Sequence, residues 1–349
     1  MVYAAYGAPV EEHVRLDDPK SGLSGIIAIH STALGPGAGG CRFWHYPDEE
    51  AAAVDAFRLA EGMSYKNALA GLPFGGGKAV LRVPEGPFDR DALFRAFGRA
   101  VRALEGRYVT AEDVGTRVRD MEVIAEETRY VAGRTPKAGL AGGDPSPWTA
   151  LGVFEALTVG ARHALDADLS ELTVAVQGTG SVGGVLCRML ADAGARLVLA
   201  DVDPGRRDRL AAIHGARLVD VADIVTAEAD IFLPCALGGV LDAASVAAMP
   251  ARLVCGAANN QLASPEIAAM LLDRGITYVP DYVANAGGII NVAAEYLGES
   301  PLDVEARVLQ IGPRVERILD QAKREGSSPA EVADRMAREA ISSAKQLAA

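Results

Sequence analysis

The chain has 349 residues, of which 50% are hydrophobic and 23% are charged, a balance typical of a globular protein and not of a disordered chain. Its 34 Lys and Arg against 46 Asp and Glu give a formal net charge of −12, which disfavours nucleic acid as a general partner. This length predicts two domains, because single domains usually have about 100–200 residues.

The first half of the chain alternates apolar segments with glycine-rich turns. We predict helices where apolar residues recur at helical spacing and strands where short apolar, β-branched runs occur. In chain order, the elements are a strand at 22–30, a glycine-rich turn at 34–42, a helix at 49–63, a glycine loop running into a strand at 71–83, a helix at 89–104, a strand within 107–116 and a helix at 118–132.

The segment 133–149 is dense in Gly and Pro and is the best candidate for a domain boundary. Beyond it, short apolar strands alternate with helices, which indicates a parallel sheet. The predicted strands are 172–176, 196–200, 216–219, 230–233, 252–256 and 276–279, and two helices follow at 303–325 and 329–347. We place the domains at 1–140 and 141–325, and we expect the final segment 326–349 to pack back on the first domain.

Several classes of protein are disfavoured by absent patterns. The four cysteines lie far apart without a CxxC pair, which indicates buried thiols of a reducing compartment (Cys41, Cys187, Cys235 and Cys255). The five histidines lack metal-ligand spacing, so we expect no metal, and no GxSxG elbow is present. Residues 1–12 lack the features of a signal peptide and no long apolar run occurs, so we expect a cytoplasmic protein without membrane contact.

A dinucleotide-binding fingerprint follows the strand at 172–176. Gly178, Gly180 and Gly183 have GxGxxG spacing directly between that strand and a helix. These glycines allow a sharp turn, close approach of a pyrophosphate and tight packing of helix on strand. The first helical residues, including Ser181 and Val182, supply free N–H groups at the positive end of the helix dipole.

An acidic residue ends the next strand at the expected distance. Asp201 lies 23 residues after Gly178 and can accept hydrogen bonds from a ribose while repelling a 2′-phosphate. With strand, helix and acid all in place, a purely structural glycine turn with a solvated aspartate is disfavoured. NAD is therefore preferred over NADP, although Arg206 and Arg207 nearby offer positive charge to a 2′-phosphate.

Two lysines flank a glycine-rich segment of the first domain. Lys66 and Lys78 are surrounded by Ala, Leu and Gly, and a buried lysine beside another cation can act as a base near neutral pH. Taken alone, each lysine is more simply explained as solvated or snorkelling. The phosphate-loop pattern fails because Ala79 follows Lys78, and Asp113, at the end of a strand, suits a capping and a catalytic role equally.

Seven motifs together resemble the amino-acid dehydrogenases of the glutamate/leucine/phenylalanine/valine family. The resemblance covers about residues 20–345, and within the family it is strongest to leucine and valine dehydrogenases. The motifs are STALGPGAGGCRFW (31–44), YKNALAGLPFGGGKAV (65–80), GRYVTAEDVGT (106–116), GDPSPWTALGVFEA (143–156), PCALGGV (234–240), GAANNQLA (256–263) and DYVANAGGIINVAAE (281–295).

The chain departs from the family pattern at two places. Pro84-Glu85 stands where many relatives have Asp-Pro, and Gly37-Ala38 stands where leucine dehydrogenases usually have Ala-Leu. The resemblance implies an α/β fold with an N-terminal substrate-binding and oligomerisation domain, a C-terminal Rossmann NAD-binding domain and a cleft between them.

The resemblance also implies roles for the residues of the first domain. Lys66 would pair with the substrate carboxylate, which the backbone of Gly39 and Gly40 approaches as well. Lys78 would be the general base that activates water, and Asp113 would exchange protons with the amine.

On the cofactor side, the resemblance places Thr149 against the cofactor and assigns Cys235, Ala236 and Asn259 to the nicotinamide side. Asn260 and Asn285 would face the substrate. The substrate side chain would contact Ala38, Ala111, Ile289 and Val292, all of them apolar. This pocket favours leucine, valine or isoleucine, with phenylalanine as the alternative because Ala38 removes pocket wall.

The predicted activity is NAD-dependent, reversible oxidative deamination of an apolar L-amino acid to the 2-oxo acid and ammonia, carried out by a homo-oligomer. Two other classes compete with this interpretation. A non-catalytic NAD-binding regulatory protein has no need of paired lysines beside an acid. A 2-hydroxy-acid dehydrogenase uses a His–acid pair and an arginine, whereas this chain offers Lys–Lys–Asp.

Overall fold

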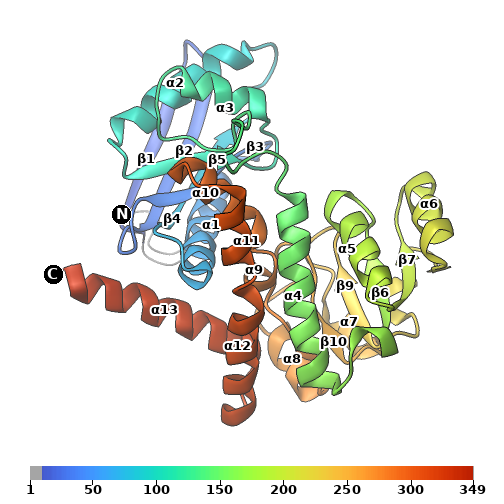
Figure 1. Ribbon diagram of the computed structural model, residues 1–349. Coiled ribbons are helices and arrows are strands. Elements are labelled where there is room, and N and C mark those ends of the chain that lie inside the picture. Colours follow the sequence, from blue (N-terminus) through green and yellow to red (C-terminus); the bar gives the residue numbers. More distant parts are fainter. Residues whose placement is uncertain (1–9, 349) are drawn as a thin grey trace. The chain divides into compact units, whose positions relative to one another are not determined.

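The computed structural model describes residues 10–348 (Figure 1). The chain divides into two compact units. Unit 1 holds the described residues up to Gly143, the segment Asn291–Pro301 and the residues from Met336 on, and unit 2 holds Asp144–Ile290 and Leu302–Arg335. We predicted that residues 1–12 do not form a signal peptide. Of these residues, the structure describes only 10–12. No helix between residues 10 and 348 is long and apolar enough to cross a membrane.

Within the described residues, unit 1 is built on a five-stranded sheet of order β1-β2-β4-β3-β5. β1 and β2 pair antiparallel, as do β2 and β4, whereas β3 runs parallel to both β4 and β5. The strands are β1 (Glu12–Asp18), β2 (Leu23–Ser31), β3 (Gly37–Trp44), β4 (Gly75–Arg82) and β5 (Tyr108–Glu112).

Helices cover both faces of this sheet. They are α1 (Glu49–Ala70), α2 (Arg90–Ala103) and α3 (Val118–Ala125). Asp48 caps the first turn of α1 by accepting a hydrogen bond from Ala51, and Gly71 ends the helix in the left-handed conformation at φ 67°. The Ala-rich side of α1, including Ala56 and Ala60, packs on β2 and β4.

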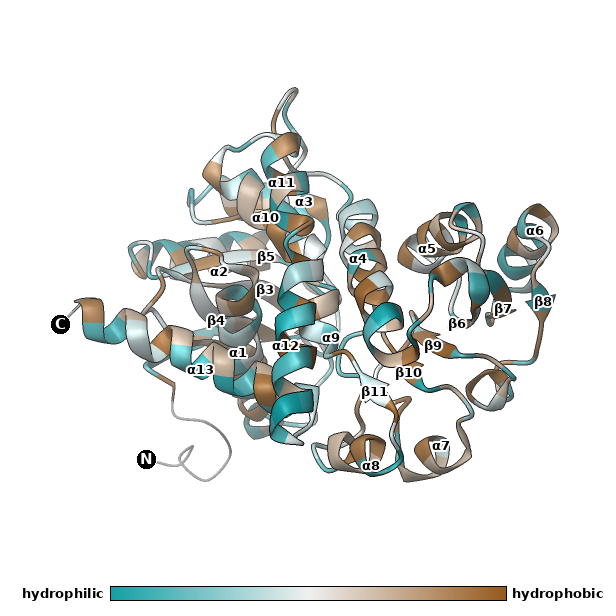
Figure 2. Cartoon of the chain, turned by 60° about the horizontal axis from the view of Figure 1, so that its bottom comes forward, coloured by the Kyte–Doolittle hydropathy of each residue, from teal (hydrophilic) through white to brown (hydrophobic). Residues whose placement is uncertain are grey.

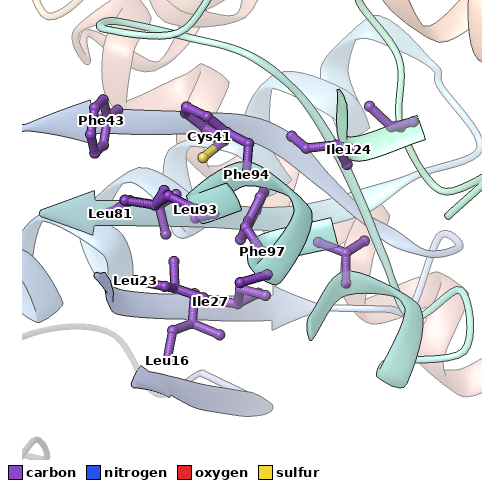
Figure 3. Packing of buried hydrophobic residues seen from close by; sticks show 14 of the residues in the cluster. Leu16, Leu23, Ile27, Cys41, Phe43, Leu81, Leu93, Phe94, Phe97 and Ile124 are labelled. Atoms are coloured by element: carbon purple, nitrogen blue, oxygen red, sulfur yellow. The ribbon is translucent and has the colours of Figure 1, made fainter. Parts of the chain in front are cut away.

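The main core of unit 1 lies on the opposite face of the sheet, beneath α2 and α3. Leu81, Leu93, Phe94 and Phe97 are fully buried there together with Ile27 (Figure 3). Because this core and the α1 layer cover the two faces of β4 from opposite sides, consecutive side chains of β4 point into different environments.

Four elements of unit 1 differ from the prediction. The helix predicted at 49–63 is longer, since α1 continues to Ala70. The predicted turn at 34–42 is mostly the buried strand β3, because its glycines allow close approach of the neighbouring backbone. β1 was not predicted at all. The helix predicted at 118–132 ends at Ala125, since the chain leaves the helix to pair with β5 through Thr110 and Val131.

The described part of unit 2 holds a six-stranded parallel sheet of order β11-β10-β9-β6-β7-β8. The strands are β6 (Thr173–Gln177), β7 (Arg196–Ala200), β8 (Arg217–Leu218), β9 (Ile231–Pro234), β10 (Leu253–Val254) and β11 (Thr277–Tyr278). The strand order reverses at β6, and in such sheets ligands bind at the carboxyl ends of the strands near this point. β9 consists of hydrophobic residues (Figure 2).

The helices of the second half surround this sheet or follow it in the chain. They are α4 (Ser146–Leu165), α5 (Ser181–Asp192), α6 (Pro204–His214), α7 (Ala243–Ala248), α8 (Ile267–Asp273), α9 (Asp281–Ala284), α10 (Gly287–Leu297), α11 (Pro301–Val308), α12 (Ile311–Glu325) and α13 (Pro329–Ala348), with short 3-10 turns η2 (Leu169–Glu171) and η3 (Ile224–Thr226).

The C-terminal part differs from the prediction in two respects. The single helix predicted at 303–325 is two helices, α11 and α12. Pro313, in the first turn of α12, has no N–H to continue the helix from the preceding turn. The segment Asn291–Pro301, which the sequence analysis placed in the second domain, groups with unit 1, and only the part of α13 from Met336 on joins it there.

Candidate active site

Lys78 points from β4 toward the α1 face of the sheet. A methyl group added at Gly76 would collide with Ser64 of α1, and one added at Gly77 would meet the Tyr108 ring in the main core. Because side chains alternate along a strand, Lys78 shares the face of Gly76. The residue is only 5% exposed, so its ammonium group is nearly removed from bulk water.

Lys78 forms an ion pair with Asp113. The Lys78 Nζ lies 2.8 Å from Oδ2 of Asp113, in the loop directly after β5. The Thr116 hydroxyl holds this loop, because it accepts a hydrogen bond from the Asp113 N–H and lies within donating distance of the carbonyl oxygens of Asp113 and Cys41. The structure therefore brings together the two residues predicted to be catalytic.

A second cation contacts the same carboxylate oxygen. The Nε of Arg42 lies 3.2 Å from Oδ2 of Asp113. Burial acts to raise the pKa of Asp113, but the charges of Lys78 and Arg42 outweigh burial and lower it. Asp113 is therefore a carboxylate at neutral pH, ready to accept a proton or a hydrogen bond.

The glycine-rich part of β3 borders this ion pair. A methyl group at Gly40 would lie 2.8 Å from the Asp113 Cβ, so no side chain fits at Gly40 without moving the carboxylate. Gly40 is the register partner of Ala111 on β5, and Ala38 and Ala111 are both nearly buried. Tyr108 donates a hydrogen bond to the Gly39 carbonyl at 2.7 Å, which holds this strand in place.

Lys66 lies near the end of α1 and is half-buried. Its neighbour Asn67 is fully buried and donates a hydrogen bond to the Gly75 carbonyl at 2.6 Å. This bond ties the end of α1 to the start of β4, the strand that carries Lys78. The predicted carboxylate-binding lysine thus lies on the helix that covers the Lys78 face.

The glycine turn of unit 2 has the shape expected for a phosphate-binding site. Gly178 has φ +93°, and a methyl group at Gly183 would overlap the Gly178 carbonyl oxygen. Gly180 is the N-cap of α5, and no described side chain caps that helix. A methyl group at Gly180 would meet only Arg206, at 3.6 Å, so there is room beside the uncapped N–H groups of Ser181 and Val182.

Asp201 lies at the end of β7, next to this turn. Its Oδ2 accepts hydrogen bonds from the N–H and the hydroxyl of Thr179 at 2.6 and 2.8 Å, and its Oδ1 accepts one from the Asp203 N–H at 2.8 Å. Burial acts to raise the pKa of Asp201, but these hydrogen bonds outweigh it and lower the pKa. Asp201 is therefore negatively charged at neutral pH.

Arg206 and Arg207, whose positive charge could attract the 2′-phosphate of NADP, each have an acidic neighbour. Arg206 lies 3.5 Å from Asp203, and Arg207 lies 2.9 Å from Asp208. These pairs reduce the positive charge that a 2′-phosphate would meet near Asp201.

An amide pair joins the loop after β10, which holds Asn259, to Asn285 at the end of α9. The Nδ2 of Asn285 donates to Oδ1 of Asn259 at 2.9 Å and to the Ala257 carbonyl at 3.1 Å. Asn285 is 4% exposed, and its Oδ1 has no hydrogen-bond partner among residues 10–348. Asn260 accepts a hydrogen bond from the Gly239 N–H at 2.7 Å and has φ +53°. The unpaired oxygen of Asn285 is available to an N–H donor of a ligand.

The remaining predicted residues lie at separate points. Cys235 and Ala236 follow β9, where Ala236 faces Gly178. The hydroxyl of Thr149 lies 2.8 Å from the position of a methyl group on Gly288. Ile289 and Val292 are one turn apart on α10, but the first groups with unit 2 and the second with unit 1.

No group of three or more His, Cys, Asp or Glu side chains between residues 10 and 348 is arranged to hold a metal ion. The four cysteines are unpaired there; Cys41, Cys187 and Cys255 are buried and Cys235 is half-buried.

A glycine turn at an uncapped helix and a buried lysine–aspartate pair are the features expected of a dehydrogenase that uses a nicotinamide dinucleotide. Residues 10–130 match the model of the Glu/Leu/Phe/Val dehydrogenase dimerisation domain, and residues 199–346 match that of glutamate/leucine/phenylalanine/valine dehydrogenase. The chain belongs to this family of amino-acid dehydrogenases.

Named relatives agree with this assignment. The chain is 46% identical to leucine dehydrogenase of Geobacillus stearothermophilus, over 95% of this chain and 90% of that protein. It is 47% identical to valine dehydrogenase of Streptomyces virginiae, over 96% and 94% of the two chains. The crystal structure of L-tryptophan dehydrogenase from Nostoc punctiforme matches with a TM-score of 0.87 and 38% identity, over 99% of this chain and 98% of that one.

The sequence analysis missed the groups that hold these residues in place. Arg42 and Thr179 each contact a predicted functional carboxylate, and Thr116 bonds the backbone of Asp113, but none of the three belongs to a periodic pattern. Arg42 lies in the motif GGCRFW, and its position two residues after Gly40 is the one signal that the sequence carries.

Proposed function

We propose that this enzyme catalyses the NAD-dependent, reversible oxidative deamination of leucine, valine or isoleucine to the 2-oxo acid and ammonia. The observation that carries the proposal is the buried 2.8 Å ion pair of Lys78 and Asp113 beside the glycines of β3. It combines a lysine sheltered from water with a carboxylate that stays ionised, the pair needed to move protons to and from an amine and a water molecule.

Unit 2 would hold the cofactor. The N–H groups at the start of α5 would bind its pyrophosphate, and Asp201 would accept hydrogen bonds from its ribose. Thr149, Cys235, Ala236 and Asn259 are assigned to its nicotinamide end. When bound, the nicotinamide ring supplies the acceptor for the hydride that leaves the substrate Cα.

Unit 1 would bind the amino acid by its carboxylate. Lys66 is the assigned partner, since a compact ammonium group at a half-buried position pairs well with a carboxylate. The backbone of Gly39 and Gly40 would approach the same group. Asn260 and Asn285 are assigned to polar atoms of the substrate.

Proton transfer would depend on Lys78 and Asp113. In its neutral form Lys78 takes a proton from water, so that the oxygen adds to the iminium carbon of the oxidised substrate. Asp113 would accept a proton from the substrate ammonium group before the hydride leaves, and would return this proton to the nitrogen of the carbinolamine that forms when water adds. Ammonia then leaves, the hydroxyl proton is released to water, and the 2-oxo acid remains. Burial of Lys78 limits competing exchange with bulk water.

The side-chain preference would follow from the apolar residues that the family resemblance assigns to the substrate side chain. Ala38, Ala111, Ile289 and Val292 offer neither charge nor hydrogen bond, so glutamate would lose the hydration of its second carboxylate without gaining a partner. The small Ala38 leaves space for a larger side chain, which makes phenylalanine the second candidate.

The preference for NAD rests on Asp201, which is ionised and held by Thr179 and Asp203. A 2′-phosphate at the ribose would be repelled by this charge. The match of residues 10–130 to a dimerisation domain supports a homo-oligomer assembled through unit 1.

One assay separates the candidate functions. The purified protein is mixed with NAD and a panel of L-amino acids and 2-hydroxy acids, and the absorbance of reduced nicotinamide is followed. Turnover of apolar L-amino acids supports the proposal. Turnover of 2-hydroxy acids alone would identify a different dehydrogenase, and NAD binding without any turnover would identify a regulatory protein.

A further inference from the structure

A chain of charged and polar side chains continues behind the Lys78–Asp113 pair. Arg42 of β3 contacts Asp113 through its Nε at 3.2 Å and Asp55 of α1 through its Nη1 at 2.9 Å. The Tyr46 hydroxyl donates a hydrogen bond to the same oxygen of Asp55. Charges of opposite sign therefore alternate from Lys78 through Asp113 and Arg42 to Asp55.

The guanidinium of Arg42 is fixed in orientation. Two of its nitrogens are bound to different carboxylates on different elements, and its side chain is only 22% exposed. A planar group held at two nitrogens cannot rotate freely, so the Nε–H keeps its direction toward Asp113. Asp55 is 25% exposed and is itself held by Tyr46.

Arg42 and Lys78 share one oxygen of Asp113. Both cations contact Oδ2, which leaves Oδ1 free of either cation. The Asp113 carboxylate therefore keeps its ion pair with Arg42 when Lys78 gives or takes a proton, because Arg42 retains its charge at any working pH. In the proposed function Lys78 is the cation that exchanges a proton, whereas the guanidinium of Arg42 keeps its charge.

We propose that Arg42 is a positioning residue of the active site, which keeps Asp113 ionised and oriented toward Lys78, and that Asp55 and Tyr46 hold Arg42 in that place. The proposal rests on the proposed function, since it presumes that Lys78 and Asp113 carry the proton transfers.

The charges around Asp113 come from several elements. Lys78 on β4 and Arg42 on β3 lower its pKa. The Cys41 thiol on β3 is fully buried, and burial raises its pKa so that it stays neutral. Thr116, in the same loop, contributes an uncharged hydroxyl. Arg42 is thus the cation whose removal changes the charge at Asp113 without touching the assigned base.

The test uses the full-length enzyme and the pH profile of kcat for deamination. Arg42→Met removes the cation at similar length. We expect the acidic limb to move up by about one pH unit because Asp113 loses a nearby positive charge, and kcat at neutral pH to fall about tenfold because Asp113 loses its fixed orientation. Arg42→Lys restores part of both. Asp55→Asn removes a negative charge that compensates Arg42. We therefore expect the acidic limb of the Asp55→Asn profile to move to lower pH or to stay in place, whereas that of Arg42→Met moves to higher pH.

A matched control is available on another helix of unit 1. Arg95 of α2 pairs with Glu126 at 2.7 Å, and Arg95→Met should leave the pH profile unchanged. An Arg42→Met enzyme with the wild-type acidic limb would overturn the proposal. The proposal would also be overturned if the acidic limbs of Arg42→Met and Asp55→Asn moved in the same direction. A structural defect does not depend on the sign of the charge that was removed, so it would shift both profiles alike.

The proposed function has a separate mode of failure. If Lys78→Ala keeps its turnover, the assignment of the base is wrong whatever Arg42 does. If Lys78→Ala is inactive while Arg42→Met retains the wild-type limb and kcat, the base assignment stands and the positioning role of Arg42 is refuted.

Discussion

Asp201 holds the glycine turn through Thr179. One oxygen of its carboxylate accepts hydrogen bonds from both the N–H and the hydroxyl of Thr179, at 2.6 and 2.8 Å. The residue predicted to bind the ribose therefore also fixes the residue between Gly178 and Gly180. A single side chain therefore links the shape of the glycine turn to the negative charge that we propose faces the ribose.

This double role makes a specific prediction for the cofactor. Asp201→Asn keeps an oxygen that accepts from Thr179 but removes the charge, so the ratio of kcat/KM for NAD over NADP should fall about tenfold. Asp201→Ala should also weaken NAD itself, because the turn loses its support. Steady-state kinetics with both cofactors measure the ratio. Wild-type enzyme that is equally efficient with NADP would refute the role of Asp201.

The Lys78–Asp113 pair predicts a pH dependence of stability. The pKa of Asp113 in the folded protein lies below its ordinary value of 3.8, so the pair stabilises the fold fully above about pH 4. This contribution is lost as the pH falls through the lowered pKa. Asp113→Asn should therefore be less stable than wild type at pH 7, and the difference in Tm should narrow in strong acid. A difference that is constant with pH contradicts this prediction.

Arg90 supplies a test of stability away from the site. It binds both carboxylate oxygens of Asp120, whose side chain is only 3% exposed, and its guanidinium lies 4.9 and 5.0 Å from the ring centres of Phe43 and Phe94. Arg90→Ala leaves a buried carboxylate unpaired, so the free energy of unfolding should fall by about 3 kcal/mol. Arg95→Ala, which breaks an exposed pair, should leave the urea midpoint nearly unchanged. Equal effects of the two substitutions would show that burial of Asp120 is irrelevant.

The small side chain of Ala38 leads to a prediction about the relative kcat/KM values for different amino acids. The kcat/KM should be highest for leucine, valine or isoleucine, lower for phenylalanine and very low for glutamate. Ala38→Leu refills the pocket and should reduce phenylalanine turnover relative to leucine by about tenfold, since one methylene changes selectivity by about 1–3 kcal/mol. A wild-type preference for glutamate would contradict the apolar pocket. If Ala38→Leu leaves the leucine-to-phenylalanine ratio unchanged, Ala38 does not line the pocket.

Local patterns in the sequence predicted the glycine turn and the neighbouring strands of unit 2 well. Gly178, Gly180, Gly183 and Asp201 have a fixed spacing because one βαβ unit builds the whole turn, and the predicted strand at 196–200 has the observed bounds. Long-range features were not accessible in this way. Lys78 and Asp113 are far apart in the chain, and the sequence analysis associated them through family resemblance alone.

The incorrect predictions of secondary structure have physical causes that lie in contacts between segments far apart in the sequence. Glycine-rich 34–42 looks like a turn, yet β3 lies between β4 and β5, where glycines let the backbones approach closely. The predicted helix at 118–132 ends early because Val131 pairs with Thr110. The assignment of 291–301 to unit 1 follows from packing of the second part of α10, which carries no composition signal.

The most direct test of the account is the turnover of Lys78→Ala. If Lys78 is the general base, kcat for leucine deamination should fall about 10²–10⁴-fold, while the Kd for NAD changes less than about threefold. Thermal unfolding of the variant controls for loss of the fold. A folded Lys78→Ala enzyme with near wild-type kcat would contradict the central claim, because the buried Lys78–Asp113 pair would then have no part in the chemistry.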